Sequence, residues 1–264
     1  MGADRRPGPA ANGEGEQMKR VMLGICLVSL LVVATGASAA SAAEPAFFEC
    51  AKLAGGKFKG GTCAEESAKG NHELVEGIGA KPLAVKSTLV DTLIPQFGPG
   101  AGKIECKKAS AKGTLASPTR ITKLVITQKE CFSTISKFCT SAGQPKHTVA
   151  TNSLEGTLGY IDAAEHRLGI DIKGEGGADI MDFNCEGLEE VIAGSAIGEV
   201  SPVGKSSSAF TAVFTRDAEG FQSISSFEGE PEDVPLGSLN GSGPYPASLS
   251  GTITFKPGKL FLKG

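Results

Sequence analysis

The residues of this chain best suited to acid–base or metal chemistry are its three histidines, His72, His147 and His166. Histidine metal sites place their ligands at set spacings such as H-x-x-x-H or H-E-x-x-H, and none of the three stands in such a pattern. A Ser-His-Asp triad needs no fixed spacing, because its members meet only in the folded chain. The sequence has no G-x-S-x-G motif, however, and its G-S-A at residues 194–196 is typical of a strand. We expect three surface histidines, no catalytic residue, no bound metal and no cofactor.

Paired carboxylates are the second set of candidates. The chain offers Asp179 with Asp182, Glu189 with Glu190, and an acidic run at residues 228–233. A glycosidase holds two carboxylates at a defined separation in a sugar cleft. Such clefts usually stack sugar rings on aromatic side chains, yet this chain has no Trp and only two Tyr. The acidic run also lacks the ordered spacing of a calcium-binding loop, so we predict solvated carboxylates.

A glycine-rich stretch, FGPGAGK at residues 97–103, has a superficial likeness to a phosphate-binding loop. That loop requires Gly at the first position and Ser or Thr after the Lys, where this chain has Phe97 and Ile104. The stretch therefore predicts a turn without nucleotide chemistry.

Residues 1–43 have the order of parts found in a secretory signal peptide. Residues 18–20 supply positive charge, residues 21–34 are apolar, and small residues follow. The apolar run of about 14 residues is short for a bilayer, which needs about 20. We predict that Met18 is the true first residue; a signal anchor with a disordered cytoplasmic tail is the alternative. Cleavage is expected after Ala39, Ala42 or Ala43.

The charge of the mature chain bounds its partners. Without residues 1–43 the chain has 22 Lys and Arg against 26 Asp and Glu, a net charge of −4, with both signs mixed along its length. Nucleic acids and anionic membranes select basic surfaces. We therefore expect no nucleic-acid partner, and we predict no transmembrane segment in the mature chain.

Cysteine number points to disulfide bonds. The mature chain keeps six cysteines, and an even number in an exported protein favours disulfides over metal ligands. They are Cys50, Cys63, Cys106, Cys131, Cys139 and Cys185. Six cysteines allow fifteen connectivities, among which the sequence does not choose. Short spacing favours Cys50–Cys63 and Cys131–Cys139, which leaves Cys106 and Cys185 for a long-range bridge. No C-x-x-C occurs, so a thioredoxin-like redox role has no support.

The elements that must position these groups are short strands. Residues 153–200 predict four consecutive strands, because apolar and polar residues alternate between turn residues. In the second of them, Asp171 and Lys173 are expected to face away from the core. Small residues at 193–198 make the fourth strand light, which indicates bending or the close approach of another layer.

Other segments show the same β composition. Further strands are expected within residues 71–78, 84–94, 103–106, 120–127, 208–216, 221–228, 247–255 and 260–263. The pair 208–216 and 221–228 predicts a hairpin. Residues 131–139 predict a disulfide-closed loop, and residues 230–246 predict one long loop. The count predicts an all-β chain, a single antiparallel β-barrel or β-sandwich domain over residues 44–264 with about ten to twelve short, disulfide-stabilised strands.

Several segments together resemble those of one protein family. They are FECAK at 48–52, the loop 131–139, TNSLEGTLGYI at 151–161, GIDI at 169–172, FNC at 183–185 and GSAIG at 194–198. Across essentially the whole mature chain, the sequence resembles a family of exported actinobacterial paralogous proteins of unassigned function. The resemblance implies an exported bacterial protein. It implies a surface or binding role better than a housekeeping enzyme, and it brings no catalytic residues.

Three functions follow as alternatives. The first is a secreted, non-catalytic β-domain with a binding or cell-envelope role, located outside the cell or at its surface. The second is a barrel that carries a small apolar ligand, because barrels of about eight strands can enclose one. Its pocket would be lined by Leu158, Tyr160, Ile170, Met181 and Phe183. The third is a secreted hydrolase that uses one histidine with a carboxylate. The sequence names no ligand, partner or oligomeric state.

Overall fold

A computed structural model describes residues 44–76, 79–87, 91–93, 103–134, 138–230 and 233–264. The predicted signal peptide and nearly all of the glycine-rich stretch 97–103 lie outside these residues. Within the described part, the regular elements are strands and one short 3-10 turn, Glu175–Gly177. The all-β prediction is therefore confirmed.

The strands are β1 (Ala46–Lys52), β2 (His72–Val75), β3 (Lys81–Ser87), β4 (Asp91–Leu93), β5 (Ile104–Ser117), β6 (Arg120–Ser133), β7 (Cys139–Thr140), β8 (Thr148–Ala150), β9 (Leu154–Asp162), β10 (Arg167–Gly174), β11 (Met181–Cys185), β12 (Leu188–Ser201), β13 (Ser206–Ser207), β14 (Phe210–Phe214), β15 (Pro235–Leu239), β16 (Ser242–Pro246), β17 (Ser248–Lys256) and β18 (Leu260–Lys263).

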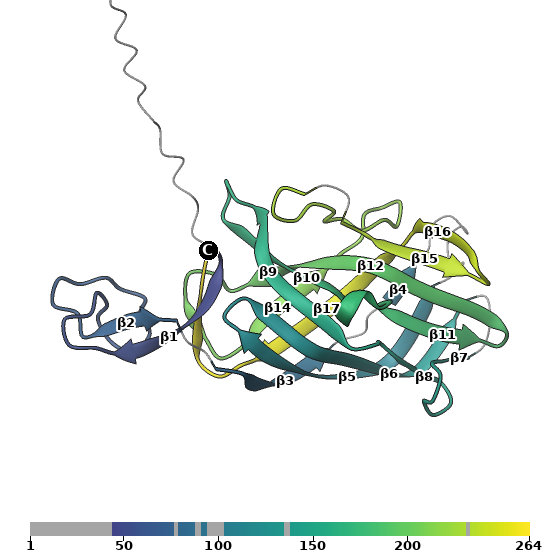
Figure 1. Ribbon diagram of the computed structural model, residues 1–264, viewed down its shortest axis with the longest axis horizontal. Helices are drawn as coiled ribbons and strands as arrows, with labels where there is room; N and C mark the ends of the chain where they lie inside the picture. Colours follow the sequence, from purple (N-terminus) through teal and green to yellow (C-terminus); the bar gives the residue numbers. More distant parts are fainter. Residues whose placement is uncertain (1–43, 77–78, 88–90, 94–102, 135–137, 231–232) are drawn as a thin grey trace, which may run out of the picture. The chain divides into compact units, whose positions relative to one another are not determined.

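Eight of the described strands form a closed antiparallel ring (Figure 1). Around the ring the order is β10, β9, β6, β5, β3, β17, β14 and β12, and β12 then pairs with β10. Closure is made by Gly169–Lys173 opposite Ser195–Glu199. Because every strand of the ring has a neighbour on both sides, the ring leaves no open edge among its members.

Apolar side chains at alternate positions fill the inside of this ring. In β10, Leu168, Ile170 and Ile172 are buried and belong to one hydrophobic cluster with residues from all eight ring strands. Alternate residues of a strand point to opposite faces of the sheet, which places these three on the inner face. A cavity bounded by Met181, Phe214 and seven other residues has a volume of about 10 Å³. This part of the interior is therefore a packed core.

Strand β12 passes from the ring into a second set of strands. Its first half pairs with β11 and β15, and its second half pairs with β10 and β14. The change falls at Gly194, whose φ of +77° is one that glycine adopts easily. At Gly198, a Cβ atom would lie 2.7 Å from the Phe214 ring. The prediction that small residues here mark a close approach is confirmed.

An outer segment covers part of the ring. We call residues 225–230 together with Asp233 the outer strap. The Glu228 backbone N–H donates to the Tyr160 carbonyl (2.9 Å), and the Glu228 carboxylate accepts from the Tyr160 N–H (2.5 Å). The strap Phe227 ring occupies the space that a side chain on Gly159 would need. The strap therefore lies against the outer face of β9.

The structure confirms one predicted disulfide and corrects two. Cys50 is bonded to Cys63 as predicted, but Cys106 is bonded to Cys131 and Cys139 to Cys185. Each corrected pair lies directly opposite in a strand ladder, β5 with β6 and β7 with β11, with Cα atoms 4.0 and 4.1 Å apart. Register across a sheet brings these cysteines closer than spacing along the chain could indicate.

Three local predictions are wrong. Residues 131–139 do not form one disulfide-closed loop, because β6 continues through Cys131 to Ser133. The hairpin expected between 208–216 and 221–228 is limited to one antiparallel bridge, Arg216 with Gln222, beside the turn at 217–220. The rest of 221–228 forms no second strand and contains another isolated bridge, Phe227 with Glu230, because β14 has its partners in β12 and β17. Residues 230–246 contain β15 and β16; prolines stand at the first position of β15 and within the largely exposed β16, where a strand tolerates them.

Candidate functional site

A pocket of about 470 Å³ lies among β11, the first half of β12 and the segment that links β7 to β8. Its walls are formed by residues 140–144, 182–184 and 189–191. We call it the Glu190 pocket. Its volume falls within the range of small-molecule sites, about 300–1,000 Å³.

A tight turn sets the register of this pocket. Glu186 and Gly187 join β11 to β12 with φ angles of +52° and +98°, the left-handed conformation that two-residue hairpin turns favour. The Gly187 N–H donates to the Asn184 side-chain oxygen (2.7 Å) and completes the turn. The resulting ladder places Glu190 opposite Phe183. Both are buried, so the carboxyl group of Glu190 occupies the face that neighbouring positions fill with apolar side chains.

Glu190 is the unusual residue of this site. It is 3% exposed, and its Oε1 atom has no hydrogen-bond partner among the described residues. Burial raises the pKa of the Glu190 carboxyl to about 8. The carboxyl is therefore mainly neutral at pH 7. An unpartnered buried polar atom costs about 1–3 kcal/mol of stability.

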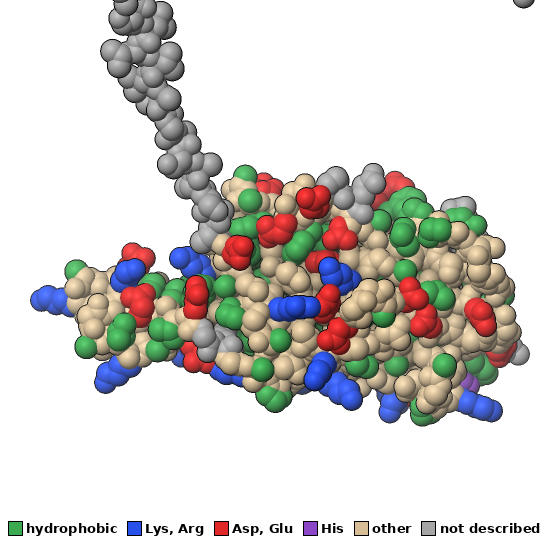
Figure 2. Space-filling model, viewed as in Figure 1, with side chains coloured by type: hydrophobic (Ala, Val, Ile, Leu, Met, Phe, Trp, Pro, Cys, Tyr) green, Lys and Arg blue, Asp and Glu red, His purple; other side chains and the backbone are tan. Residues whose placement is uncertain are grey.

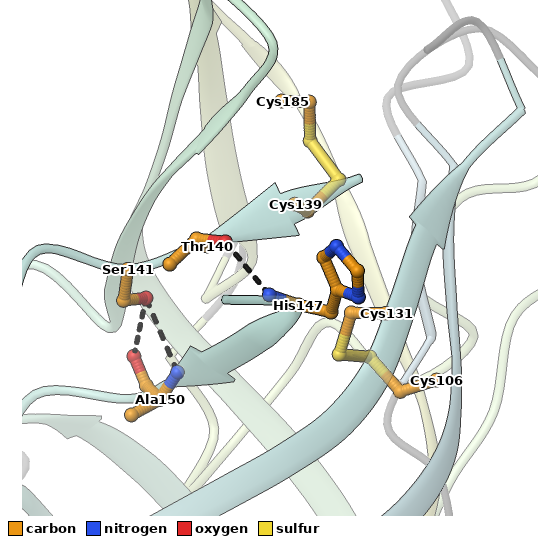
Figure 3. Close-up of a disulfide and its surroundings, with 8 residues drawn as sticks. All are labelled: Cys106, Cys131, Cys139, Thr140, Ser141, His147, Ala150 and Cys185. Carbon is orange, nitrogen blue, oxygen red and sulfur yellow. Dashed lines mark hydrogen bonds between the residues drawn. A yellow bond between two sulfur atoms is a disulfide. The ribbon is translucent and has the colours of Figure 1, made fainter. Parts of the chain in front are cut away.

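Hydroxyl groups and disulfides hold the opposite wall in place (Figure 3). The Ser141 hydroxyl donates to the Asp182 carbonyl (2.6 Å) and accepts from the Ala150 N–H (3.1 Å). The Thr140 hydroxyl accepts from the His147 N–H (3.0 Å). The Cys139–Cys185 disulfide joins β7 to β11 beside them. Both hydroxyls thus bind backbone atoms, and neither is positioned as a nucleophile activated by a base.

Two further carboxylates border the pocket. Asp182 and Glu189 are exposed, and the Asp182 Oδ2 atom accepts a hydrogen bond from Asn152 (3.0 Å). The pocket lining contains no Lys, Arg or His. On the face shown in Figure 2, Asp and Glu side chains gather over the upper part, and Lys and Arg lie mainly along the lower edge.

Asp171 on β10 and Asp233 in the outer strap form a second acidic pair. Asp171 is 5% exposed, and burial, followed by the nearby Asp233 carboxylate, raises its pKa to about 6. Burial also raises the pKa of Asp233, which accepts a hydrogen bond from the Ser195 hydroxyl. Asp171 was expected to face away from the core, as its register shows, but the strap removes it from solvent.

A larger pocket of about 690 Å³ lies between the β1–β2 region and the turn between β5 and β6. Its charged lining includes Lys57, Glu66 and Glu76, which are exposed. Water already solvates exposed charged groups of this kind, so binding a partner there gains little free energy. We therefore take the Glu190 pocket, whose volume suits a small molecule, as the candidate functional site.

The three histidines stand on separate elements. His147 stacks on Phe138, with ring centroids 3.8 Å apart, and His72 lies beside Asn71, with Nδ1 2.6 Å from Oδ1. His166 is exposed in the turn between β9 and β10. Among the described residues, no group of three or more His, Cys, Asp or Glu side chains is placed to hold a metal ion.

The five residues proposed to line a ligand pocket are all buried. Met181 borders the interior cavity of about 10 Å³, and Phe183 borders the Glu190 pocket. Leu158, Tyr160 and Ile170 belong to the barrel core. Met181 and Phe183 therefore border two different pockets. Leu158, Tyr160 and Ile170 line neither of these two pockets.

Glu189 and Glu190, which the sequence presents as one pair of carboxylates, differ in the folded chain. Glu189 is exposed and Glu190 is buried. The sequence contains a pattern that predicts this difference. Leu188, Glu190 and Ile192 occupy alternate positions of one strand and therefore share one face, and Glu190 is the acidic residue on that otherwise apolar face.

The sequence matches no protein-family model, no curated protein and no solved structure. Within the described residues, the structure contains no helix with the length and hydropathy needed to cross a membrane. What the fold and the site define is a class of architecture: a disulfide-bonded antiparallel β-barrel with an acid-lined pocket beside the ring.

Proposed function

We propose that this protein is an exported, non-catalytic β-barrel domain that binds a ligand in the Glu190 pocket, outside the cell or in the cell envelope. The observation that carries the proposal is a pocket of about 470 Å³ whose lining includes the exposed polar side chains of Asp182, Asn184 and Glu189. These three side chains offer hydrogen-bond donors and acceptors to a ligand.

The surrounding residues favour binding over catalysis. Ser141 and Thr140 use their hydroxyls to hold the backbone of the pocket wall. A nucleophile in an enzyme instead needs a neighbouring base within hydrogen-bond reach. The function is therefore better described as recognition by a rigid pocket.

Export is supported by the three disulfides, which persist in oxidising compartments. The signal-like order of residues 1–43 supports it from the sequence. Membership in the exported actinobacterial family, and with it a bacterial origin, stays part of the proposal. Intact-mass measurement of the chain recovered from culture medium tests export. We expect the mass of a chain cleaved after Ala39, Ala42 or Ala43. Retention of the full-length chain inside the cell would contradict it.

A small-ligand carrier is the second candidate, and one residue separates it from the first. Met181 is the single methionine after residue 43, and it borders the interior cavity. Selective ¹³C labelling of its methyl group therefore gives one NMR signal that reports on the barrel interior. Val191, which borders the Glu190 pocket, gives a second reporter.

The two reporters decide between the candidates. Protein purified from its native source is first analysed by native mass spectrometry for a bound molecule, and a fragment mixture is then titrated into the labelled protein. We expect the Val191 methyl signals to shift while the Met181 signal stays unchanged. A shift of Met181 alone would favour the carrier, because a ligand would then have opened the packed core. If neither signal moves, the binding proposal fails.

A further inference from the structure

Lysine side chains gather on the outer wall of the barrel. Lys86 follows the buried Val85 and Lys256 follows the buried Phe255, so both lysines point away from the core. We call five exposed residues the lysine face: Lys86 on β3, Lys108 and Lys112 on β5, Lys129 on β6 and Lys256 on β17. In the view of Figures 1 and 2, β3, β5 and β6 lie at the lower edge of the barrel, where Lys and Arg side chains are concentrated.

Strand pairing brings these lysines onto one surface. Lys256 lies opposite Ala84, and Ala84 lies opposite Lys112, so the three side chains share a face. Neighbouring strands are about 4.8 Å apart, which separates the two lysine positions by about 10 Å with only a methyl group between them. Four residues from Lys112 on the same strand, and so on the same face, Lys108 lies directly opposite Lys129.

Little negative charge offsets this surface. Lys108 forms an ion pair with Glu130. Within the described ranges, the ion pairs include none of the other four lysines, Lys86, Lys112, Lys129 and Lys256. Like charges directly opposite each other in a ladder are destabilising, so the pairing of Lys108 with Lys129 costs the free protein stability. An anion bound over the two ammonium groups would remove that cost.

The distribution of charge comes from the fold. Along the sequence the two signs are mixed, and the mature chain has a net charge of −4. The folded chain nevertheless places five lysines and one carboxylate side by side on this wall. A surface with one sign of charge attracts an oppositely charged partner even when the whole protein carries the same sign as that partner.

The residues between the lysines indicate which anion fits. Ser110 and Thr127 lie opposite each other on the same face and offer hydroxyl donors. Phosphate accepts hydrogen bonds strongly, and lysine binds it as a point charge. The face has no Arg, the residue whose planar fork suits carboxylates. Among the described outward-facing residues of these strands, none is aromatic, so nucleobases have no ring to stack on and a membrane has no aromatic anchor.

The extent of the face indicates a polymer. Lys108 and Lys112 are four residues apart, about 14 Å along β5, and the face spans four strands. A single phosphate group is too small to contact all of these lysines. We propose that the lysine face binds a linear polymer with repeated phosphate groups, through ion pairs and hydroxyl hydrogen bonds. This surface is separate from the Glu190 pocket, and the proposal goes beyond the ligand binding proposed for that pocket.

The test uses the disulfide-intact mature protein, with long-chain inorganic polyphosphate as the probe and calorimetry over a series of salt concentrations. Binding to a flexible polyanion releases counterions, so the logarithm of the binding constant falls with the logarithm of salt concentration by about 0.7 per phosphate neutralised. We expect a slope of about −3, as four lysines without ion pairs would give. No binding at a salt concentration of about 50 mM would overturn the inference.

A triple variant locates the binding. K112Q/K129Q/K256Q removes three charges from the lysine face and keeps the exposed side chains at similar size. We expect the salt slope to become shallower by about 2, and the affinity near 100 mM salt to fall about tenfold or more. Circular dichroism checks that the variant is folded.

A control variant carries the same change in net charge. K52Q/K59Q/K69Q removes three exposed lysines from β1 and from the segment between β1 and β2. We expect its affinity to stay within about threefold of wild type, because these lysines lie outside the lysine face. Equal losses in the two variants would mean that binding follows net charge alone, and would overturn the inference.

Other polyanions test the class of partner. Oligothymidylate, dextran sulfate and vesicles that contain phosphatidylglycerol are compared with polyphosphate at equal concentrations of anionic groups. We expect polyphosphate to bind most tightly, because it presents phosphate without bases or acyl chains. Tighter binding of oligothymidylate, of dextran sulfate or of the vesicles would overturn the assignment and identify a nucleic acid, a sulfated polymer or a membrane as the partner.

Discussion

Replacement of Glu190 by glutamine tests what the burial of this carboxyl does to its protonation and to the stability of the fold. The variant removes the ionisable group and keeps nearly the same shape. In the folded protein the pKa of Glu190 is about 8, compared with an ordinary value of 4.5. Between these two values, the folded chain holds a proton that the unfolded chain has released.

The sign of the effect follows from this difference. Glu190 contributes most to stability below pH 4.5, where both states are protonated, and this contribution is lost as the pH rises through 8. Each pH unit changes the free energy of unfolding by about 1.4 kcal/mol. The full loss is therefore about 4–5 kcal/mol between pH 4.5 and pH 8.

The variant should lose this pH dependence. The introduced amide would leave its N–H donors unpaired, so we expect E190Q to be about 1–3 kcal/mol less stable than wild type at pH 4.5. At pH 8.5 we expect E190Q to be the more stable protein, because wild type must then ionise a buried acid. The measurement is urea unfolding of the disulfide-intact mature chain at half-unit pH steps, with slopes compared to confirm that both proteins unfold alike.

E186Q provides the matched control, since Glu186 is an exposed glutamate in the turn that joins the same two strands. Its stability difference from wild type should stay within about 0.5 kcal/mol across the range. The reasoning is refuted if the difference between E190Q and wild type changes by less than about 1 kcal/mol from pH 5 to pH 8.5. That result would mean that Glu190 ionises in the folded protein with an ordinary pKa.

Three other predictions follow from the same structure. Asp171→Asn should flatten the pH dependence of stability between pH 3.8 and 6, where wild type loses up to about 3 kcal/mol as Asp171 ionises. Urea unfolding at pH 4 and pH 7 checks this, and a pH dependence equal to that of wild type would contradict it. Replacement of both Cys139 and Cys185 by Ala should cost about 4 kcal/mol, because that disulfide spans 46 residues; a loss below about 1 kcal/mol in chemical unfolding would argue against the bond. Gly198→Ala should cost about 1–3 kcal/mol through its clash with Phe214, and a second change of Phe214 to Leu should recover part of that loss. Additive losses in this thermal unfolding series would rule out the clash.

Much of the fold could be predicted from alternation alone. The four strands within residues 153–200 appear as β9, β10, β11 and β12, and the last two strands appear as β17 and β18. Alternation succeeds because successive side chains of a strand face opposite sides, whatever the partner strand is. The same rule could have identified Glu190 as a core-facing residue.

The partners of these strands could not be predicted in this way. Cys106 meets Cys131 because β5 and β6 form a long ladder in one register, and Cys139 meets Cys185 because β7 pairs with β11. Spacing along the chain favoured Cys131 with Cys139, which are close in sequence but lie on different strands. The register of two paired strands depends on contacts between segments that are distant in the chain, and the local sequence of either segment does not indicate its partner.

The residues themselves thus determined that this protein is built from strands, that its six cysteines form disulfides, and which side chains share a face of each strand. The tertiary structure decided which strands meet, how the ring closes, and which polar groups lose their water. Asp171 shows the difference most clearly: its register turns it away from the core, and a strap more than fifty residues further along the chain buries it. Burial changes the pKa of a carboxyl because desolvation depends on everything packed around the group, and that environment exists only once the chain is folded.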